Sequence, residues 1–133
     1  MPVTINGLDG NPMTGRDIDA SPNNFIFSFH KLAFNGSYTT AIGGDTLDLT
    51  AIAALIPSSG LPLQIAETLN GGTGSFSKSG GYCEIEIGPT LATCKIKFFS
   101  AGGTELGTQT YAAALINLAA ENIGISITWR KLL

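Results

Sequence analysis

The chain has 133 residues, of which only 13% are Asp, Glu, Lys or Arg, whereas an ordinary soluble domain carries about 25%. Ten acidic and seven basic residues give a net charge of −3, the wrong sign for holding the phosphates of a nucleic acid. No apolar run reaches the roughly 18 residues of a membrane-spanning helix. We therefore expect one domain that binds neither nucleic acid nor membrane. Its shortage of charge indicates a component of an assembly rather than a free enzyme.

Short segments with alternating apolar and polar residues, separated by glycines and prolines, run through the chain and predict an all-β fold. Three phenylalanines alternate over residues 25–29 of the first long strand. Leu32 and Phe34 continue at even-numbered positions, which would lie on the opposite face of a regular strand. A bulge or bend is therefore expected near His30. All these phenylalanines are expected on the inner face of a sheet.

The middle of the chain predicts one short helix between strands. Leu49, Ile52, Ala53 and Ile56 fall at helical spacing after a short strand at residues 46–49, and a proline then ends the pattern. A further strand is expected at residues 61–69. The glycine- and serine-rich residues 70–81 predict an exposed loop.

The clearest hairpin joins residues 83–87 to residues 94–98, with glutamates and lysines alternating on its outer face. Its two cysteines, Cys83 and Cys94, are expected to be small buried thiols, because a cytosol keeps thiols reduced. Residues 111–118 are ambiguous between strand and helix. A last strand is expected at residues 123–129.

These elements predict an antiparallel β-sandwich, jelly-roll-like, with one short helix. Residues 25–133 are assigned to the sandwich. Residues 1–24 are assigned to an extended N-terminal arm, because residues 9–24 contain hardly any periodic hydrophobes. The arm is expected to dock on a neighbouring molecule, and a partly disordered tail is the alternative. The candidate interaction residues of the arm are Val3, Ile5, Leu8, Met13 and Arg16.

We find no set of residues in the sequence that would support catalysis, a cofactor or a metal. The only histidine, His30, lies in a predicted core strand, and one histidine with two hairpin cysteines does not match a zinc motif. Residues 72–79 resemble a phosphate-binding loop, but they lack its second glycine and precede a strand instead of a helix. The expectation is a protein that is not an enzyme.

Several segments together carry a resemblance to a known class of protein. They are the stretch Lys31–Thr50, Gly81-Tyr82, Lys95–Phe98, Glu105-Leu106-Gly107 and the segment Tyr111-Ala-Ala-Ala. In these segments the chain resembles small β-rich virion proteins of tailed bacteriophages, of the capsid decoration or cement type. The similarity covers roughly residues 30–130 and leaves out the N-terminal arm.

This resemblance implies a non-enzymatic protein, often a homotrimer, that binds the capsid exterior and staples neighbouring major capsid subunits. Such a protein would be assembled in the host cytoplasm and located in the virion. The alternative is a tail, baseplate or fibre component, including a module that binds glycans through aromatic residues such as Tyr38. The charged hairpin face is expected to meet solvent. The arm, residues 70–81 and residues 50–66 are the expected contact surfaces.

Overall fold

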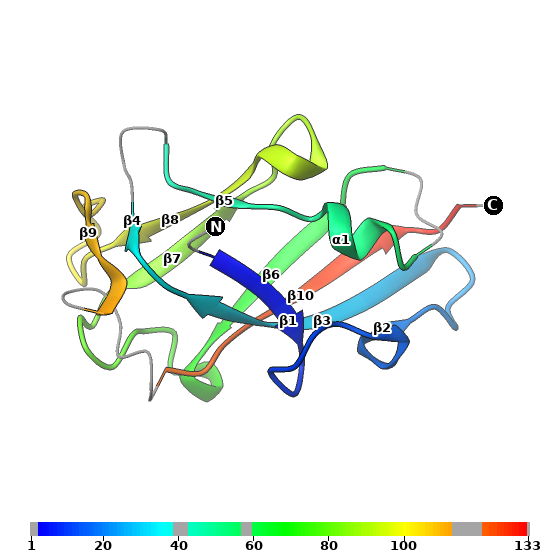
Figure 1. Ribbon diagram of the computed structural model, residues 1–133, viewed down its shortest axis with the longest axis horizontal. Helices are drawn as coiled ribbons and strands as arrows, with labels where there is room; N and C mark the ends of the chain where they lie inside the picture. Colours follow the sequence, from blue (N-terminus) through cyan, green and yellow to red (C-terminus); the bar gives the residue numbers. More distant parts are fainter. Residues whose placement is uncertain (1–2, 39–42, 57–59, 113–120, 133) are drawn as a thin grey trace.

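The computed structural model describes residues 3–38, 43–56, 60–112 and 121–132 (Figure 1). It consists mostly of β-strands in antiparallel sheets, which confirms the all-β class, and the short helix lies where it was expected. The strands are β1 (Val3–Gly7), β2 (Ile18–Asp19), β3 (Phe25–Phe34), β4 (Ser37–Tyr38), β5 (Asp45–Leu47), β6 (Gln64–Leu69), β7 (Tyr82–Glu86), β8 (Cys94–Phe99), β9 (Gln109–Thr110) and β10 (Ile123–Arg130). The α-helix is α1 (Thr50–Ala53), and short 3-10 turns cover Gly15–Asp17, Asn70–Gly72 and Leu91–Thr93.

The largest sheet has the strand order β1-β3-β10-β6, with β2 also paired to β3. Its central pair runs in one unbroken register, from Phe25 opposite Arg130 to Lys31 opposite Gly124. The bulge expected near His30 is therefore wrong. The inner side of β3 is filled by its even-numbered residues, because these pair with the isoleucines and the tryptophan of β10.

Two smaller sheets complete the fold, one with the order β5-β8-β7 and one made of β4 and β9. The predicted hairpin is the β7–β8 pair, in which Glu84 lies opposite Lys97 and Glu86 opposite Lys95. Lys97 and Glu86 form an ion pair with 3.0 Å between Nζ and Oε2. The expected charged outer face of this hairpin is confirmed.

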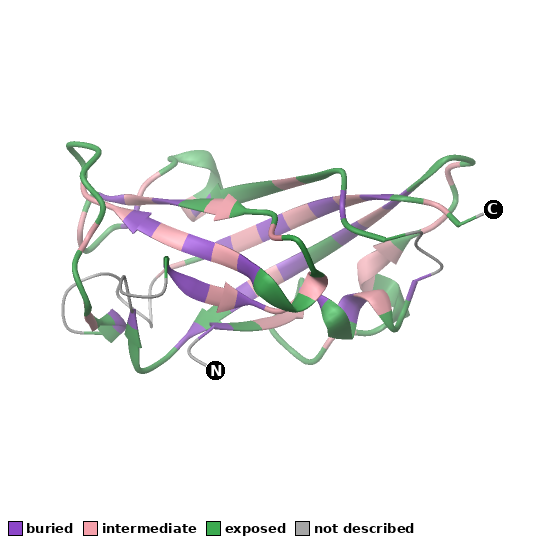
Figure 2. Ribbon diagram, turned by 90° about the horizontal axis from the view of Figure 1, so that it is seen from above, coloured by how far each residue is buried: buried purple, intermediate pink, exposed green. Residues whose placement is uncertain are grey.

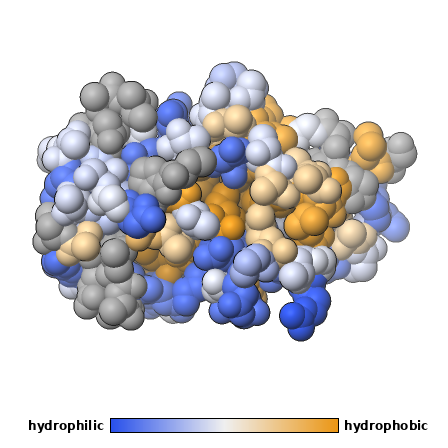
Figure 3. Space-filling view, viewed as in Figure 1, coloured by the Kyte–Doolittle hydropathy of each residue, from blue (hydrophilic) through white to orange (hydrophobic). Residues whose placement is uncertain are grey.

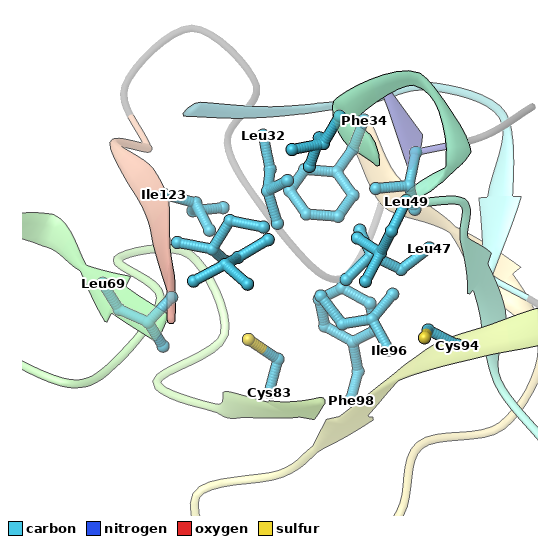
Figure 4. Packing of buried hydrophobic residues seen from close by; sticks show 14 of the residues in the cluster. Leu32, Phe34, Leu47, Leu49, Leu69, Cys83, Cys94, Ile96, Phe98 and Ile123 are labelled. Atoms are coloured by element: carbon cyan, nitrogen blue, oxygen red, sulfur yellow. The ribbon is translucent and has the colours of Figure 1, made fainter. Parts of the chain in front are cut away.

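Buried residues from the two larger sheets and α1 form one hydrophobic cluster, part of which is shown in Figure 4. An aromatic group lies within this cluster, with ring centroids 5.0–6.3 Å apart: Phe34, Tyr38, Phe76, Phe98 and Tyr111. Phe76 belongs to the loop that was expected to be wholly exposed, and yet it is 1% exposed. A glycine-rich loop can run over the surface while one aromatic residue anchors it to the core.

The N-terminal segment does not stand apart from the domain as the arm prediction assumed. β1 pairs with β3 over five residues, from Val3 opposite Phe34 to Gly7 opposite His30, and β2 pairs with β3 farther along. Asp17 accepts hydrogen bonds from the backbone amides of Leu8 and Thr14 at 3.0 and 2.9 Å and so closes the loop between these strands. Residues 9–24 lack a periodic pattern because side-chain hydrogen bonds of Asp17 and a few irregularly spaced hydrophobic residues, Met13, Ile18 and Ala20, hold this segment against the domain.

The two cysteines are free and buried, as expected. Cys83 lies opposite Phe98, four residues along β8 from Cys94, and Figure 4 shows the two sulfurs apart. Burial raises the pKa of the Cys83 thiol to about 12. The ambiguous segment 111–118 lies outside the described residues from residue 113 onward.

Candidate functional site

The side of the five-stranded sheet that faces away from the core, here called the outer face, carries a row of exposed aromatic residues. Phe25, Phe27 and Phe29 occupy alternate positions of β3, a strand in which buried residues alternate with intermediate or exposed ones. Alternating burial of this kind appears as coloured stripes along strands in Figure 2. Phe25 is 42% exposed and Phe29 is 40% exposed, while Phe27 between them is half-buried. The prediction that these phenylalanines face the core is therefore wrong.

The strands beside this row carry small or uncharged side chains on the outer face. The register places the following residues there: Thr4, Asn6, Ala33, Gln64, Ala66, Thr68, Gly124, Ser126 and Thr128. The charged residues among the described strand positions of the face are Asp19, Lys31 and Arg130. The exposed phenylalanine row therefore lies among mostly uncharged polar side chains, and exposed aromatic residues gathered in this way are typical of a contact surface.

A hollow of about 220 Å³ lies on the outer face at the Phe29 end of the row. The missing side chain of Gly124 opens its floor, and Phe29 and Leu8 line it together with the uncharged polar residues Thr68 and Ser126. Leu8 is 63% exposed, the highest value among the exposed large hydrophobic residues described. The hollow can receive an apolar side chain or ring without burying a charge.

The candidate interaction residues of the N-terminal segment fall into two groups. Val3 is 4% exposed and belongs to the core, and Ile5 and Met13 pack against it from the side. Leu8 and Arg16 are exposed, and both line a second hollow of about 510 Å³ beside the Asp17-closed loop. The structure thus brings Leu8 and Arg16 together at this hollow. It places Val3 in the core and packs Ile5 and Met13 against the core.

Tyr38, the expected sugar-binding aromatic residue, is completely buried. Its hydroxyl donates to Glu105 at 3.1 Å and accepts a hydrogen bond from the backbone amide of Phe98 at 3.2 Å. Burial, together with the nearby Glu105, raises the pKa of Tyr38 to about 12. Tyr111 likewise donates its hydroxyl to the buried Asp45. These groups hold the core together and are inaccessible to a ligand.

His30 is 1% exposed and, among the described residues, neither of its ring nitrogens has a hydrogen-bond partner. Burial lowers its pKa to about 4, although the Asn6 backbone and the Asp17 carboxylate favour the charged form. A buried imidazole with no hydrogen-bond partner among the described residues does not resemble a catalytic base, which must exchange a proton with a neighbouring group. Within the described residues, no three His, Cys, Asp or Glu side chains lie close enough together to hold a metal ion.

The expectation that these phenylalanines face the core depended on a bulge near His30, which would reconcile their positions with those of Leu32 and Phe34, and the unbroken register excludes that bulge. Ile26 shares the parity of Leu32 and Phe34, and all three are buried. A strand with apolar residues at both odd and even positions is typical of a segment that is covered on both faces. That signal, present in the sequence, indicates a second apolar face on β3.

Seen from the side shown in Figure 3, apolar residues gather near the middle and over α1, and hydrophilic residues lie around the rim. No helix in the described part of the chain is long and apolar enough to cross a membrane. A comparison of the chain with protein-family models, with curated proteins and with solved structures finds no match.

Proposed function

We propose that this chain is a bacteriophage capsid decoration protein, which binds the outside of the shell and staples neighbouring major capsid subunits. The single observation that carries the proposal is the outer face, where an exposed row of phenylalanines lies among small and mostly uncharged side chains. Exposed apolar patches of this kind mark protein-binding surfaces, because water contact with them is unfavourable. The low charge of the whole chain supports the same conclusion.

The proposal includes the finer architecture and the assembly state. The five-stranded and three-stranded sheets are the two layers of an antiparallel β-sandwich, which is supported by the single cluster of buried residues that both supply. The protein self-associates, and the resemblance implies a homotrimer. Its site of action is the virion exterior after assembly in the host cytoplasm, and it performs no catalysis.

The direct test mixes the purified protein with DNA-filled capsids that lack it, followed by sedimentation and measurement of its copy number per particle. The proposal expects a fixed copy number and capsids that resist heating longer. A Phe25→Ser/Phe29→Ser variant is expected to bind less, whether the outer face contacts the capsid itself or a neighbouring bound copy. An Ile87→Ser variant, which removes an exposed isoleucine after the β7 strand, is expected to bind normally. Failure of the wild-type protein to bind any capsid surface contradicts the proposal.

The hollow beside Phe29 favours a second candidate, a tail, baseplate or fibre component that binds glycans. An aromatic ring next to uncharged hydroxyl and amide groups, supplied here by Thr68, Ser126 and Asn122, suits the apolar and hydroxylated sides of a neutral sugar. A glycan array separates the two candidates. Saturable binding of a neutral glycan that is lost in Phe29→Ser supports the second one, and an array without binding contradicts it.

A further inference from the structure

The proposed function leaves open which molecule covers the outer face, and the distribution of charge on this face bears on that question. Asp19 lies on one side of the phenylalanine row, on β2 opposite Phe27. Arg130 lies on the other side, on β10 opposite Phe25. Both residues are exposed, and hydrogen bonds from the Ser21 hydroxyl and amide lower the pKa of Asp19 and keep it ionised.

From this arrangement, and resting on the proposed role as a decoration protein, we infer that a second copy of this chain covers the outer face. The two copies form a two-fold pair whose axis runs along β3, in place of the homotrimer that the resemblance implies. This rotation exchanges the two sides of the row. It therefore places Asp19 of each copy near Arg130 of the other. Measured along the strand direction, the two residues are offset by two positions, which is roughly 7 Å. Each phenylalanine meets its own counterpart, which is the self-complementary pattern that a two-fold interface requires.

The hollow on the outer face obeys the same symmetry. Leu8 stands on the β1 side of the row at the level of Phe29, and Ser126, which lines the hollow, lies opposite Phe29 on β10. Rotation about β3 brings the exposed leucine of each copy over Ser126 at the hollow of the other copy. Lys31, the remaining charged residue of the face, extends its stem toward Gly10 and away from the row.

The size of the face limits how strong the contact can be. Four strands span roughly 14 Å and the eight steps from Phe25 to Ala33 span roughly 27 Å. Taken as a flat patch, this area is roughly 380 Å² per copy, about half of the 800 Å² per partner that a stable specific interface buries, so the contact is weak and transient. The pair is therefore expected to form at high protein concentration, such as that on a particle surface.

The test measures the solution mass of the purified chain by light scattering over a concentration series. The inference expects the mass to rise from 13.8 kDa towards twice that value. Phe27→Ser is expected to raise the dissociation constant by about tenfold or more, because it removes the central apolar contact. Ile87→Ser is the control and should leave the constant unchanged.

A charge swap tests whether these two residues meet across the contact. Asp19→Lys and Arg130→Asp should each weaken the pair, and the double variant should restore it, because the pair places Asp19 of each copy near Arg130 of the other. Together with a mass that stops at two copies, restoration supports the two-fold arrangement. Circular dichroism of each variant checks that it is folded, and Arg130→Asp alone suffices if Asp19→Lys disturbs its turn.

Three outcomes overturn the two-fold pair: a strict monomer at all concentrations, a mass series that ends at a trimer, and a double swap that fails to restore the pair although both single variants weaken it. The first two of these are compatible with capsid binding, which is measured separately. A protein that pairs as described and binds no capsid contradicts the proposed function instead.

Discussion

Trp129 donates its indole N–H to the hydroxyl of Ser28, at 2.9 Å, although 101 residues separate them in the sequence. Both side chains are completely buried. The bond links the first long strand, β3, to the last one, β10, on the inner side of the five-stranded sheet. It explains why a serine is tolerated in a core strand, since the indole nitrogen requires an acceptor when it is buried.

Replacing Ser28 with alanine is expected to lower the free energy of unfolding by about 1–3 kcal/mol, because the Trp129 N–H loses its acceptor. Urea denaturation followed by tryptophan fluorescence measures this loss. Ser126→Ala, on the outer face of the same sheet, is the matched control and should change stability by less than about 0.5 kcal/mol. Equal effects of the two substitutions would contradict the role of the buried bond.

The stability of the fold is expected to depend on pH through His30. Its pKa is about 4 in the folded protein, whereas an unfolded histidine titrates near 6.5. Between these values the unfolded chain binds a proton that the folded chain does not, so the stabilisation is complete above pH 6.5 and is lost as the pH falls. The loss amounts to about 3 kcal/mol when the pH reaches 4.

His30→Leu removes the titrating imidazole, and so it separates the contribution of His30 to the pH dependence of stability from that of the carboxylates. The difference in unfolding free energy between variant and wild type, measured in urea at pH 7.5 and pH 4.5, should shift in favour of the variant at the lower pH. An identical pH dependence of the two proteins would show that the His30 imidazole is not buried without partners.

The thiols are expected to stay reduced even under oxidising conditions. Cys94 lies four residues along β8 from the partner of Cys83, roughly 13 Å, and a disulfide needs Cα atoms within about 7 Å. After incubation with oxidised glutathione, intact mass spectrometry should give an unchanged mass. Alkylation should be slow in the native state and fast in urea. A mass lower by two hydrogens would contradict the observed register.

Val3→Ala tests whether the N-terminal segment is part of the folded domain. Val3 is 4% exposed in β1, so its truncation should cost about 1–3 kcal/mol by leaving a cavity. Thr4→Ala, at the adjacent exposed position, should cost much less. No loss of stability in Val3→Ala would support an arm that stands apart from the domain.

The sequence was sufficient for the strands whose two faces differ in polarity. In β7, β8 and β10, the alternation of apolar residues with charged or small ones predicted both the strands and their buried sides. The same was true of α1, where the apolar residues recur at helical spacing before Pro57. In these elements the local pattern and the tertiary packing agree, so the pattern alone is informative.

The outer face and the N-terminal segment could not be derived in the same way. β3 has apolar residues at both odd and even positions, so only its pairing with β10 decides that Phe27 faces outward and Ile26 inward. The five-residue β1 gains its stability from pairing with β3, and no local signal specifies that long-range contact. Both errors arose where partner strands, and not local periodicity, determine the structure.

The most direct test of a covered outer face is hydroxyl-radical footprinting of the protein in intact particles and of the dilute, isolated protein. The account predicts that Phe25 and Phe29 are oxidised at least severalfold more slowly in the particle, while Ile87, on the hairpin, is oxidised at the same rate in both. Equal oxidation of the two phenylalanines in the particle and in the free protein would contradict the account, because the outer face would then be open to water in both states.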